Sequence, residues 1–241
     1  MATDLGPIAF SPGGEEWLEY QDGGERRRVG FHDYEAIYAV PGLYERVFYD
    51  ELGMRSSTEV VGAFGRALAQ EGRLPSGQRV FEVGAGNGIG GAALRELGVA
   101  CLVGLDLQPM AREAAERDRP GVYDDYLVAD LTALGAQSAE DLCSRRFTAV
   151  LALAAVGAGH LPPAGLKRAL ELLEPGGLFA FAVTPDLLPG SSDPAGRETG
   201  YPDLLARLLA GGRELARHAY VHRRQTDNTP HDAVALVGCV A

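Results

Sequence analysis

The chain of 241 residues lacks an excess of positive charge and has almost no lysine. Its 33 acidic residues outnumber its 22 lysines and arginines, which gives a formal charge of −11, and Arg26–Arg28 is the longest basic run. Binding to nucleic acid or to an anionic membrane surface needs a local excess of basic residues, so the composition argues against both partners. Lys167, the single lysine, is typical of a GC-rich coding sequence and indicates no function.

Cysteines and long apolar runs are also scarce. Cys101, Cys143 and Cys239 lie far apart and include no CxxC spacing, which argues against a zinc site or a disulfide framework. The longest weakly polar stretch, residues 147–159, is too short and too rich in glycine for a membrane helix. No basic segment followed by an apolar core marks a signal peptide. We therefore expect a cytoplasmic protein without a metal site.

What the sequence does contain, from about residue 71 onward, is a regular alternation of strand-like and helical patterns. Apolar runs typical of strands cover 79–83, 101–105, 126–129, 147–153 and 178–184. Helical patterns cover 89–97, 109–118, 136–143, 163–173 and 201–210. Apolar strands joined by helices predict a parallel sheet covered on both faces, which is a doubly wound α/β fold. Two further strands, 214–223 and 233–240, flank a turn-like segment and predict an antiparallel pair at the sheet edge.

The first 70 residues do not show this alternation of strand-like and helical patterns. Residues 17–21 and 25–29 flank an Asp-Gly-Gly turn signal and predict a hairpin. Residues 33–70 show helical patterns interrupted by Pro41 and Gly42. We predict two units, an N-terminal segment with a helical cap over 1–70 and a catalytic domain over 71–241.

The main chemical signal is a glycine-rich turn between the strand at 79–83 and the helix at 89–97. It reads Glu-x-Gly-x-Gly-x-Gly and consists of Glu82, Gly84, Gly86 and Gly88 with the residues between them. Glycine permits positive φ and lets a ligand approach the backbone, and the following helix offers free N–H groups. Residues 86–91 also fit the dinucleotide pattern G-x-G-x-x-G, so a nicotinamide enzyme is an alternative.

Three further motifs lie at strand ends. Asp106 ends the second strand and can accept hydrogen bonds from ribose hydroxyls, or it caps the helix that begins near Pro109. Asp130 comes after the third strand, where a carboxylate can accept from an exocyclic adenine amine. A Leu-Glu-Pro-Gly-Gly segment, residues 173–177, precedes the fifth strand.

With these motifs in this order, residues 58–240 resemble the class I S-adenosylmethionine-dependent methyltransferases. The resemblance implies a Rossmann-like sheet of seven mostly parallel strands, the last of them antiparallel, and S-adenosyl-L-methionine as the cofactor. It implies that the backbone of Gly84, Gly86 and Gly88 lies against the methionine part of the cofactor. Glu82 would then orient this loop or contact the ammonium group. The remaining implied contacts are ribose with Asp106, adenine with Leu107, Asp130 and Leu131, and the pocket wall with residues near Ala152 to Ala154.

Candidates for catalysis lie near the same predicted edge. His160 comes after the fourth strand and is either a general base or a loop histidine that bonds the backbone. His32, Tyr34 and Tyr38 lie in the predicted cap, and the two tyrosines are one helical turn apart. The two tyrosines are candidates to contact the cofactor carboxylate or the substrate, and the alternative is an aromatic stripe that packs the cap on the core. His32, with Asp33 beside it, is either a base with a polar neighbour or only the start of a helix. Asp186 lies after the fifth strand and borders the predicted pocket.

The segment after the fourth strand constrains the acceptor. Family members that methylate planar amino groups often carry Asn/Asp-Pro-Pro-aromatic there, whereas this chain has Ala154–Gly157. This argues against N-methylation of nucleobases or glutamine. We expect O- or C-methylation of a small molecule, in secondary metabolism. The alternatives are a peptide or protein acceptor and a cofactor-binding subunit without catalysis, and whether the chain forms a homodimer stays open.

Overall fold

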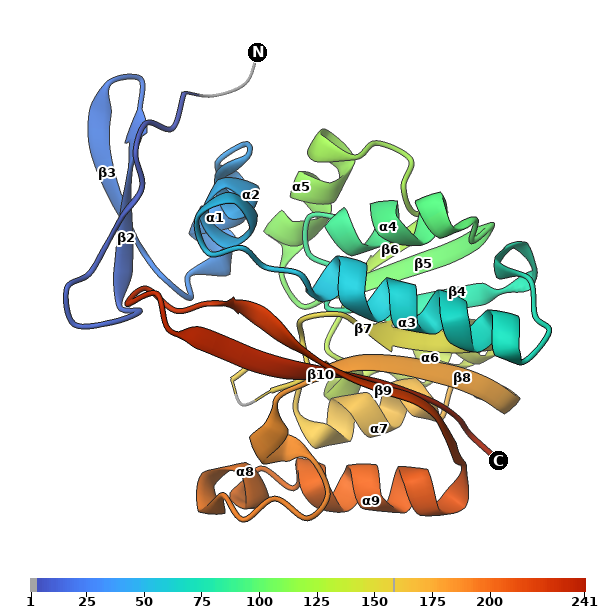
Figure 1. Cartoon of the computed structure of the whole chain (residues 1–241). Coiled ribbons are helices and arrows are strands. Elements are labelled where there is room, and N and C mark those ends of the chain that lie inside the picture. The colour runs from blue at the N-terminus through green and yellow to red at the C-terminus, as the bar shows by residue number, and fades with distance from the viewer. Residues whose placement is uncertain (1–3, 158) are drawn as a thin grey trace.

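A seven-stranded sheet forms the centre of the molecule. The computed structural model describes residues 4–157 and 159–241, so Ala158, in the loop before His160, lies outside the described residues (Figure 1). The strands have the order β6-β5-β4-β7-β8-β10-β9. Neighbouring strands from β6 to β8 are parallel, whereas β10 is antiparallel to β8 and β9. The bounds are β4 (Arg79–Val83), β5 (Cys101–Asp106), β6 (Asp125–Val128), β7 (Phe147–Ala152), β8 (Leu173–Val183), β9 (Arg213–Arg224) and β10 (Pro230–Cys239).

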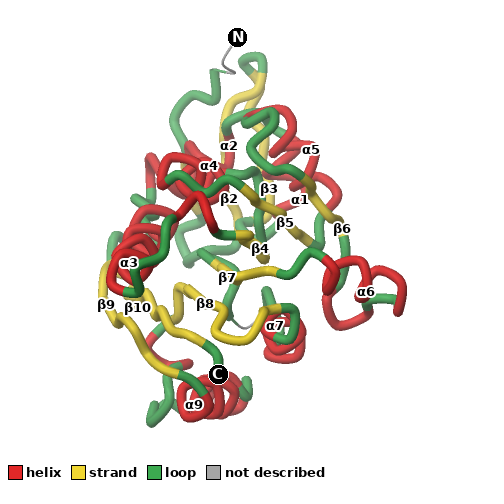
Figure 2. The backbone as a smooth tube through the Cα atoms, turned by 90° about the vertical axis from the view of Figure 1, so that its right-hand side faces the viewer, coloured by secondary structure: helices red, strands yellow, loops and turns green. Residues whose placement is uncertain are grey.

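Helices cover both faces of this sheet, because successive residues of a strand point to opposite faces. In β4, Val80 packs in the core beneath α3 and α4, and its neighbour Phe81 packs in the core beneath α6, α7 and α9. Figure 2 shows helices on either side of the strands. The helix bounds are α3 (Ser56–Gln70), α4 (Ile89–Leu97), α5 (Pro109–Asp118), α6 (Ala136–Ser144), α7 (Pro163–Leu170), α8 (Pro194–Glu198) and α9 (Tyr201–Gly211).

The predicted fold class is confirmed, and so is the antiparallel pair at the edge of the sheet. The largest difference in boundaries concerns β8, which begins at Leu173 and not at residue 178. Leu173 already pairs with Phe147, and the register shifts before Ala149 pairs with Leu178. Gly176 has φ of +71° and so permits this irregularity inside the strand. The Pro-Gly-Gly segment is therefore a bulge in β8 and not a separate turn.

The N-terminal residues form a smaller layer with a core of its own. Strands β1 (Ala9–Phe10), β2 (Trp17–Asp22) and β3 (Glu25–Gly30) make a three-stranded antiparallel sheet, which confirms the predicted hairpin. Helices α1 (Tyr34–Ala39) and α2 (Leu43–Glu45) and the π-helical turn η1 (Arg46–Glu51) come next. Leu18 and Tyr20 of β2 pack with Ile37 and Phe48 of these helices.

Helix α3 belongs by its contacts to the central sheet. Val60 and Phe64 pack with Ala149 and Leu151 of β7, although the predicted boundary at residue 70 placed this segment with the cap. The layer that covers the sheet edge therefore consists of residues up to about Leu52, and α3 connects it to the catalytic domain. Figure 1 shows β2 and β3 standing apart from the central sheet, with α1 and α2 between them and α5.

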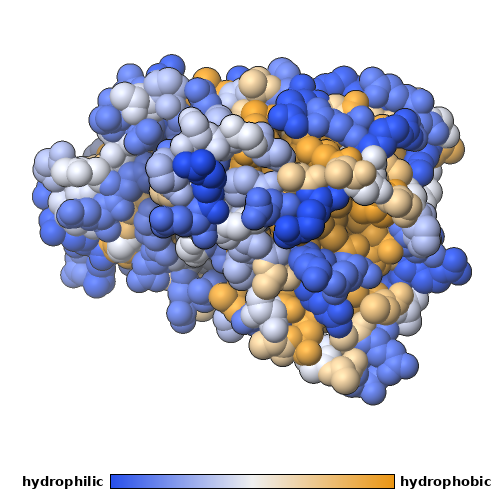
Figure 3. Space-filling view, turned by 90° about the horizontal axis from the view of Figure 1, so that it is seen from below, coloured by the Kyte–Doolittle hydropathy of each residue, from blue (hydrophilic) through white to orange (hydrophobic). Residues whose placement is uncertain are grey.

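Both hydrophilic and apolar residues lie on the surface. Seen from the side of α8 and α9, hydrophilic residues cover most of the surface and apolar residues gather on one half (Figure 3). Within the described residues, no helix combines the length and the apolar character that crossing a membrane requires.

The topology brings distant segments to one edge of the sheet. Ligands of open α/β sheets bind beyond the carboxyl ends of the parallel strands, and β4, β5, β7 and β8 all end at this edge. Because β10 is antiparallel, its first residues lie there too, with Val234 opposite Val183 at the end of β8. The turn between β9 and β10 therefore extends past the same edge.

Candidate functional site

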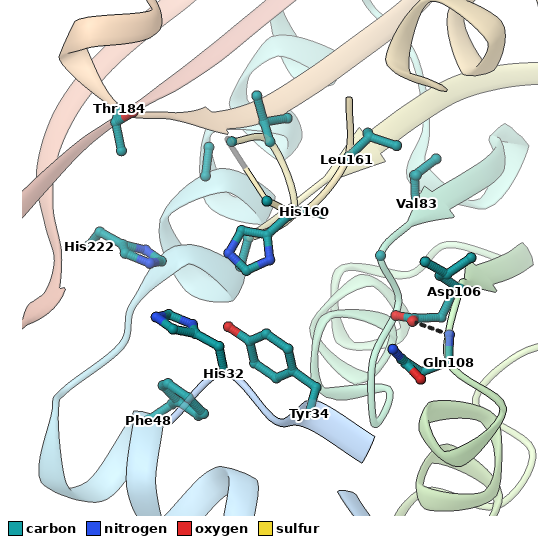
Figure 4. A pocket seen from close by; sticks show the side chains of 18 of the residues that line it. His32, Tyr34, Phe48, Val83, Asp106, Gln108, His160, Leu161, Thr184 and His222 are labelled. Atoms are coloured by element: carbon teal, nitrogen blue, oxygen red, sulfur yellow. Dashed lines mark hydrogen bonds between the residues drawn. The ribbon is translucent and has the colours of Figure 1, made fainter. Parts of the chain in front are cut away.

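A cavity of about 510 Å³ lies at the carboxyl edge of the sheet. This volume is within the range of small-molecule sites, about 300–1,000 Å³. Three groups of residues line it: the loops after the parallel strands, the aromatic side chains of the cap, and the residues around the β9–β10 turn. Figure 4 shows Asp106 and Val83 on one side and the rings of the cap and of His160 and His222 on the other.

The glycine loop after β4 forms one wall of the cavity. Gly84 has φ of +70°, and a Cβ there would lie 2.3 Å from the Cβ of Ala155. Gly86 has φ of +53°, and a Cβ there would lie 2.6 Å from the hydroxyl oxygen of Tyr38. Neither position tolerates a side chain, so the loop backbone stays close to the cavity and to the cap above it.

Asp106, at the end of β5, lies beside this loop. Its Oδ2 accepts from the amide of Gly86 at 2.9 Å, and its Oδ1 accepts from the amide of Gln108 at 3.0 Å. Burial raises the pKa of Asp106, while the backbone donors act in the opposite direction. A carboxylate oxygen has two lone pairs, so both oxygens can still accept from a ligand.

An apolar surface suited to a flat ring adjoins Asp106. Leu107 is 61% exposed although it lines the cavity, which leaves its side chain uncovered. Leu131 is buried at the start of the 3-10 turn η3 (Leu131–Ala133). Asp130 caps this turn by accepting from the amide and the hydroxyl of Thr132 at 2.8 and 2.7 Å. Asp106 can accept hydrogen bonds from hydroxyl groups, and it lies next to the apolar side chains of Leu107 and Leu131. This arrangement fits a nucleoside.

Glu82 lies beneath the loop and does not line the cavity. Its side chain is 2% exposed and accepts a hydrogen bond from the hydroxyl of Tyr123 at 2.9 Å. Burial raises the pKa of Glu82 to about 8, although the hydrogen bond from Tyr123 lowers it in part. A Cβ on Gly90 would lie within 2.4 Å of Leu153 and would also overlap Glu82. The glycine that extends the motif therefore serves internal packing.

An aromatic and imidazole surface forms the opposite wall. The ring of His160 lies 6.2 Å from that of His32 and 5.7 Å from that of Tyr34, and the rings of His32 and Tyr34 are 6.2 Å apart. Burial lowers the pKa of His160, and the charges of His32 and Arg223 act in the same direction. His160 is therefore neutral at pH 7 and can accept a proton. Burial raises the pKa of Tyr34 to about 12, so its hydroxyl remains a neutral donor.

Four lining residues with charged or imidazole side chains were not anticipated from the sequence. His222 and Arg223 come from β9, His231 from β10, and Glu15 from the loop before β2. Burial lowers the pKa of His222 to about 3, and its Nδ1 lies 2.6 Å from the hydroxyl of Ser56. With His32 and His160, four of the five histidines of the chain line this one cavity.

A sequence signal for the β9–β10 residues did exist. The predicted antiparallel strand has to begin at the edge where the parallel strands end, so polar residues that flank its turn belong to the site. His222, Arg223 and His231 flank the turn-like segment 227–230 in this way. Nothing comparable marks Glu15, which lies in a polar N-terminal segment.

The predicted site residues fall into two groups in the structure. Nine of them line the cavity: His32, Tyr34, Tyr38, Gly84, Asp106, Leu107, Asp130, Leu131 and His160. Four do not: Glu82 beneath the loop, Gly86 against Tyr38, Gly88 at the start of α4, and Ala152 at the end of β7. Of the wall predicted near Ala152 to Ala154, Ala154 lines the cavity and Ala152 does not, and the wall continues to Ala155.

Comparison with solved structures identifies the fold. NodS, an N-methyltransferase from Bradyrhizobium japonicum WM9 in complex with S-adenosyl-L-homocysteine, matches with a TM-score of 0.56 at 15% identity, over 86% of this chain and 96% of that one. ChlM, the magnesium protoporphyrin IX methyltransferase from Synechocystis PCC 6803 with bound cofactor, gives a TM-score of 0.52 at 17% identity, over 77% and 80% of the chains. PH1948, a putative RNA methyltransferase from Pyrococcus horikoshii, gives 0.53 at 12% identity, over 75% and 83%.

At these identities the structural likeness shows the fold alone. A comparison with curated proteins gave no match. Residues 81–181, from the glycine loop through most of β8, match the family model described as a methyltransferase domain. This match covers the segments that carry Glu82, the glycine loop, Asp106 and Asp130, and it favours a methyltransferase over the nicotinamide alternative. Residues 81–181 therefore form a methyltransferase domain within a Rossmann-like methyltransferase fold, and the protein is an enzyme that uses S-adenosylmethionine as its cofactor.

Proposed function

We propose that this methyltransferase methylates an oxygen or carbon atom of a small-molecule acceptor, in secondary metabolism. The observation that carries the proposal is the continuity of the cavity. It extends from Gly84 and Asp106 to the wall formed by His32, Tyr34 and His160, beneath the cap. A cavity of about 510 Å³ that is lined in part by the cap favours a small acceptor over an extended peptide.

The residues around Asp106 fit the cofactor. We propose that Asp106 accepts from the ribose hydroxyls, that the uncovered Leu107 packs on adenine, and that Asp130 and Leu131 face the adenine edge. The positive φ of Gly84 keeps its backbone open to the methionine part. When bound, S-adenosylmethionine supplies a methyl group that its sulfonium charge has already activated. The protein then has to position the acceptor and exclude water.

His160 is the proposed general base for a hydroxyl or a carbon acid. It is neutral at pH 7, lies after β7 at the carboxyl edge, and faces the cavity beside Tyr34 (Figure 4). Removal of the acceptor proton by His160 raises the nucleophilicity of the acceptor atom. His160 is itself partly exposed, and the side chain of the neighbouring His32 is 55% exposed, so a proton on His160 can pass to solvent. Tyr34 donates a hydrogen bond that orients the acceptor.

The proposed acceptor class rests on this wall and on the sequence after β7. Ala154 and Ala155 carry no polar group to hold a planar amine. The solved relatives carry names that point to unlike acceptors, a porphyrin and an RNA among them, so they do not select one for this chain. The preference for arginine over lysine, which is typical of a GC-rich coding sequence, supports a role in secondary metabolism.

A labelled-methyl screen tests the proposal. The purified protein is incubated with methyl-labelled cofactor and with sets of phenols, hydroxy acids, enolisable carbon acids, amines and basic peptides. We expect transfer to phenols, hydroxy acids or carbon acids, and loss of that transfer in His160→Ala. The matched control is His218→Ala, because His218 lies outside the cavity and pairs with Glu59. Transfer to peptides or amines alone would contradict the proposal.

A further inference from the structure

Tyr123, on the loop between α5 and β6, lies in a space that three glycines provide. A Cβ on Gly91 would lie 2.7 Å from its ring, one on Gly104 would lie 2.9 Å away, and one on Gly88 would lie 3.4 Å away. These glycines come from α4, β5 and the glycine loop. The ring thus lies between the loop and the sheet, in space that the three glycines leave because they have no side chain.

The hydroxyl of Tyr123 contacts the carboxyl group of Glu82 beneath the loop. It donates to Oε2 of Glu82 at 2.9 Å and lies 3.4 Å from the carbonyl oxygen of Ala85. Tyr123 therefore contacts both the acid that precedes the loop and the backbone of the loop itself. Tyr126 holds the same loop from β6, donating to the carbonyl oxygen of Gly86 at 2.7 Å.

Glu82 has no cation to balance a negative charge. Within the described residues it forms no ion pair with arginine, lysine or histidine. The ionisable groups around it are Tyr123, Asp106, Tyr126 and Tyr49, of which the tyrosines are neutral and Asp106 is an acid. A carboxyl group that is buried without a positive partner retains its proton. The raised pKa of about 8 agrees with this geometry.

We propose that Tyr123 is a positioning residue for the cofactor loop and that Glu82 loses its proton to solvent when the cationic cofactor binds. In this step the O–H bond of Glu82 breaks, the proton passes to the buffer, and the carboxylate keeps the electron pair and the hydrogen bond from Tyr123. The positive charge of the cofactor at the glycine loop replaces the missing cation and favours the ionised form. The inference concerns cofactor binding, and it holds whichever acceptor the enzyme methylates.

Calorimetry of the intact protein at pH 7 tests the proton step. Binding of S-adenosylmethionine is measured in two buffers that differ in heat of ionisation, and the difference in heat gives the number of protons released. We expect release of a measurable fraction of one proton. S-adenosylhomocysteine, which lacks the sulfonium charge, should release fewer. Equal heats in the two buffers, or equal release from the two ligands, would overturn the proposal.

Two variants test which group releases the proton and whether Tyr123 acts on Glu82. Glu82→Gln has no proton to lose and should remove the buffer dependence, whereas dependence that persists would place the proton on another group such as Asp106. Tyr123→Phe removes a hydrogen bond to Glu82, so the affinity should fall roughly threefold to tenfold and the pH of half-maximal proton release should rise.

Tyr126→Phe is the matched control, because Tyr126 holds the loop without a hydrogen bond to Glu82. It should lower the affinity and leave the pH of half-maximal release unchanged. If Tyr123→Phe likewise lowers the affinity without moving that pH, Tyr123 has only a structural role and the proposal fails.

Discussion

Glu15 and Arg223, 208 residues apart in the sequence, form a two-pronged ion pair at the cavity wall. The two nitrogens of Arg223 lie 2.6 and 2.9 Å from the two oxygens of Glu15, and the guanidinium lies 5.5 Å from the ring of Phe31. Among the described residues, this pair is the only hydrogen-bonded link between residues 4–33 and the chain beyond residue 54. It fastens the three-stranded N-terminal sheet to β9.

Glu15→Gln should destabilise the protein by about 1–3 kcal/mol, because it leaves the largely buried Arg223 without its anion. The free energy of unfolding is measured by chemical denaturation. The matched control is Glu25→Gln, which removes the anion from the exposed pair with Arg27 and should change the stability by less than about 0.5 kcal/mol. Equal effects in the two variants would show that the Glu15–Arg223 pair does not hold the sheet.

Asp106→Asn should weaken the binding of S-adenosylhomocysteine by about tenfold or more. The amide accepts at one atom only, and it sets a donor against the amide of Gly86 or of Gln108, both of which the carboxylate accepts from. Isothermal calorimetry measures the affinity. Asp141→Asn, on the exposed face of α6, is the control and should leave the affinity unchanged. An unaltered affinity in Asp106→Asn would contradict the ribose assignment.

His160→Ala should slow methyl transfer by about 10²–10⁴-fold without a comparable loss of cofactor affinity, because general-base catalysis contributes rate accelerations of this order. Since burial lowers its pKa, His160 stays neutral to lower pH than an ordinary histidine, so the acid limb of the rate profile should lie below pH 6.5. Single-turnover rates across pH measure both effects.

His32→Ala provides a second test of the same base. The charge of His32 lowers the pKa of His160, so removal of His32 should move the acid limb to higher pH. If the acid limb does not move in His32→Ala, the limb belongs to a group other than His160. If turnover survives in His160→Ala, another group takes the proton.

Glu82 should make the stability depend on pH with a defined sign. The folded state keeps the proton up to a pKa of about 8, whereas the unfolded chain loses it near the ordinary glutamate value of 4.5. The folded state therefore binds more protons between these values, and stability falls as pH rises through this window.

Glu82→Gln removes that dependence, so its stability relative to the wild type should increase from pH 5 to pH 8 by an amount on the order of a few kcal/mol. Unfolding free energies at the two pH values measure the change. Glu116→Gln, on the exposed side of α5, is the control and should show no such trend. A constant difference between wild type and Glu82→Gln would mean that Glu82 is ionised in the folded state.

The elements of the central domain were predictable because each depends on its own sequence. Helices α4 and α5 begin and end at the predicted residues, since glycine or proline lies at their ends and apolar residues recur at helical spacing between them. The start of β8 was not predictable in the same way. Pro175 and Gly176 are typical of a turn, and only the pairing of Leu173 with Phe147 makes them part of a strand.

The candidate site likewise has features that local sequence predicts and features that depend on tertiary packing. Gly84, Asp106, Asp130 and His160 each lie at or after the end of a strand, and parallel strands end at one edge, so their proximity could be expected from the order of the motifs. The detailed roles of the site residues could not be predicted in this way. The resemblance left open whether Glu82 orients the loop or contacts the ammonium group of the cofactor, and packing places it beneath the loop against Tyr123.

The sequence by itself determined a Rossmann-like methyltransferase fold, a glycine loop and the motifs at the strand ends, because apolar periodicity and short motifs are local properties of the chain. Only the tertiary structure decided that four histidines meet in one cavity, that Glu15 pairs with Arg223, and that Tyr123 occupies the space left by three glycines. The physical reason is that these contacts join segments up to 208 residues apart. The sequence indicates that the β9–β10 turn lies at the edge of the site, but the contacts themselves depend on how the layers pack.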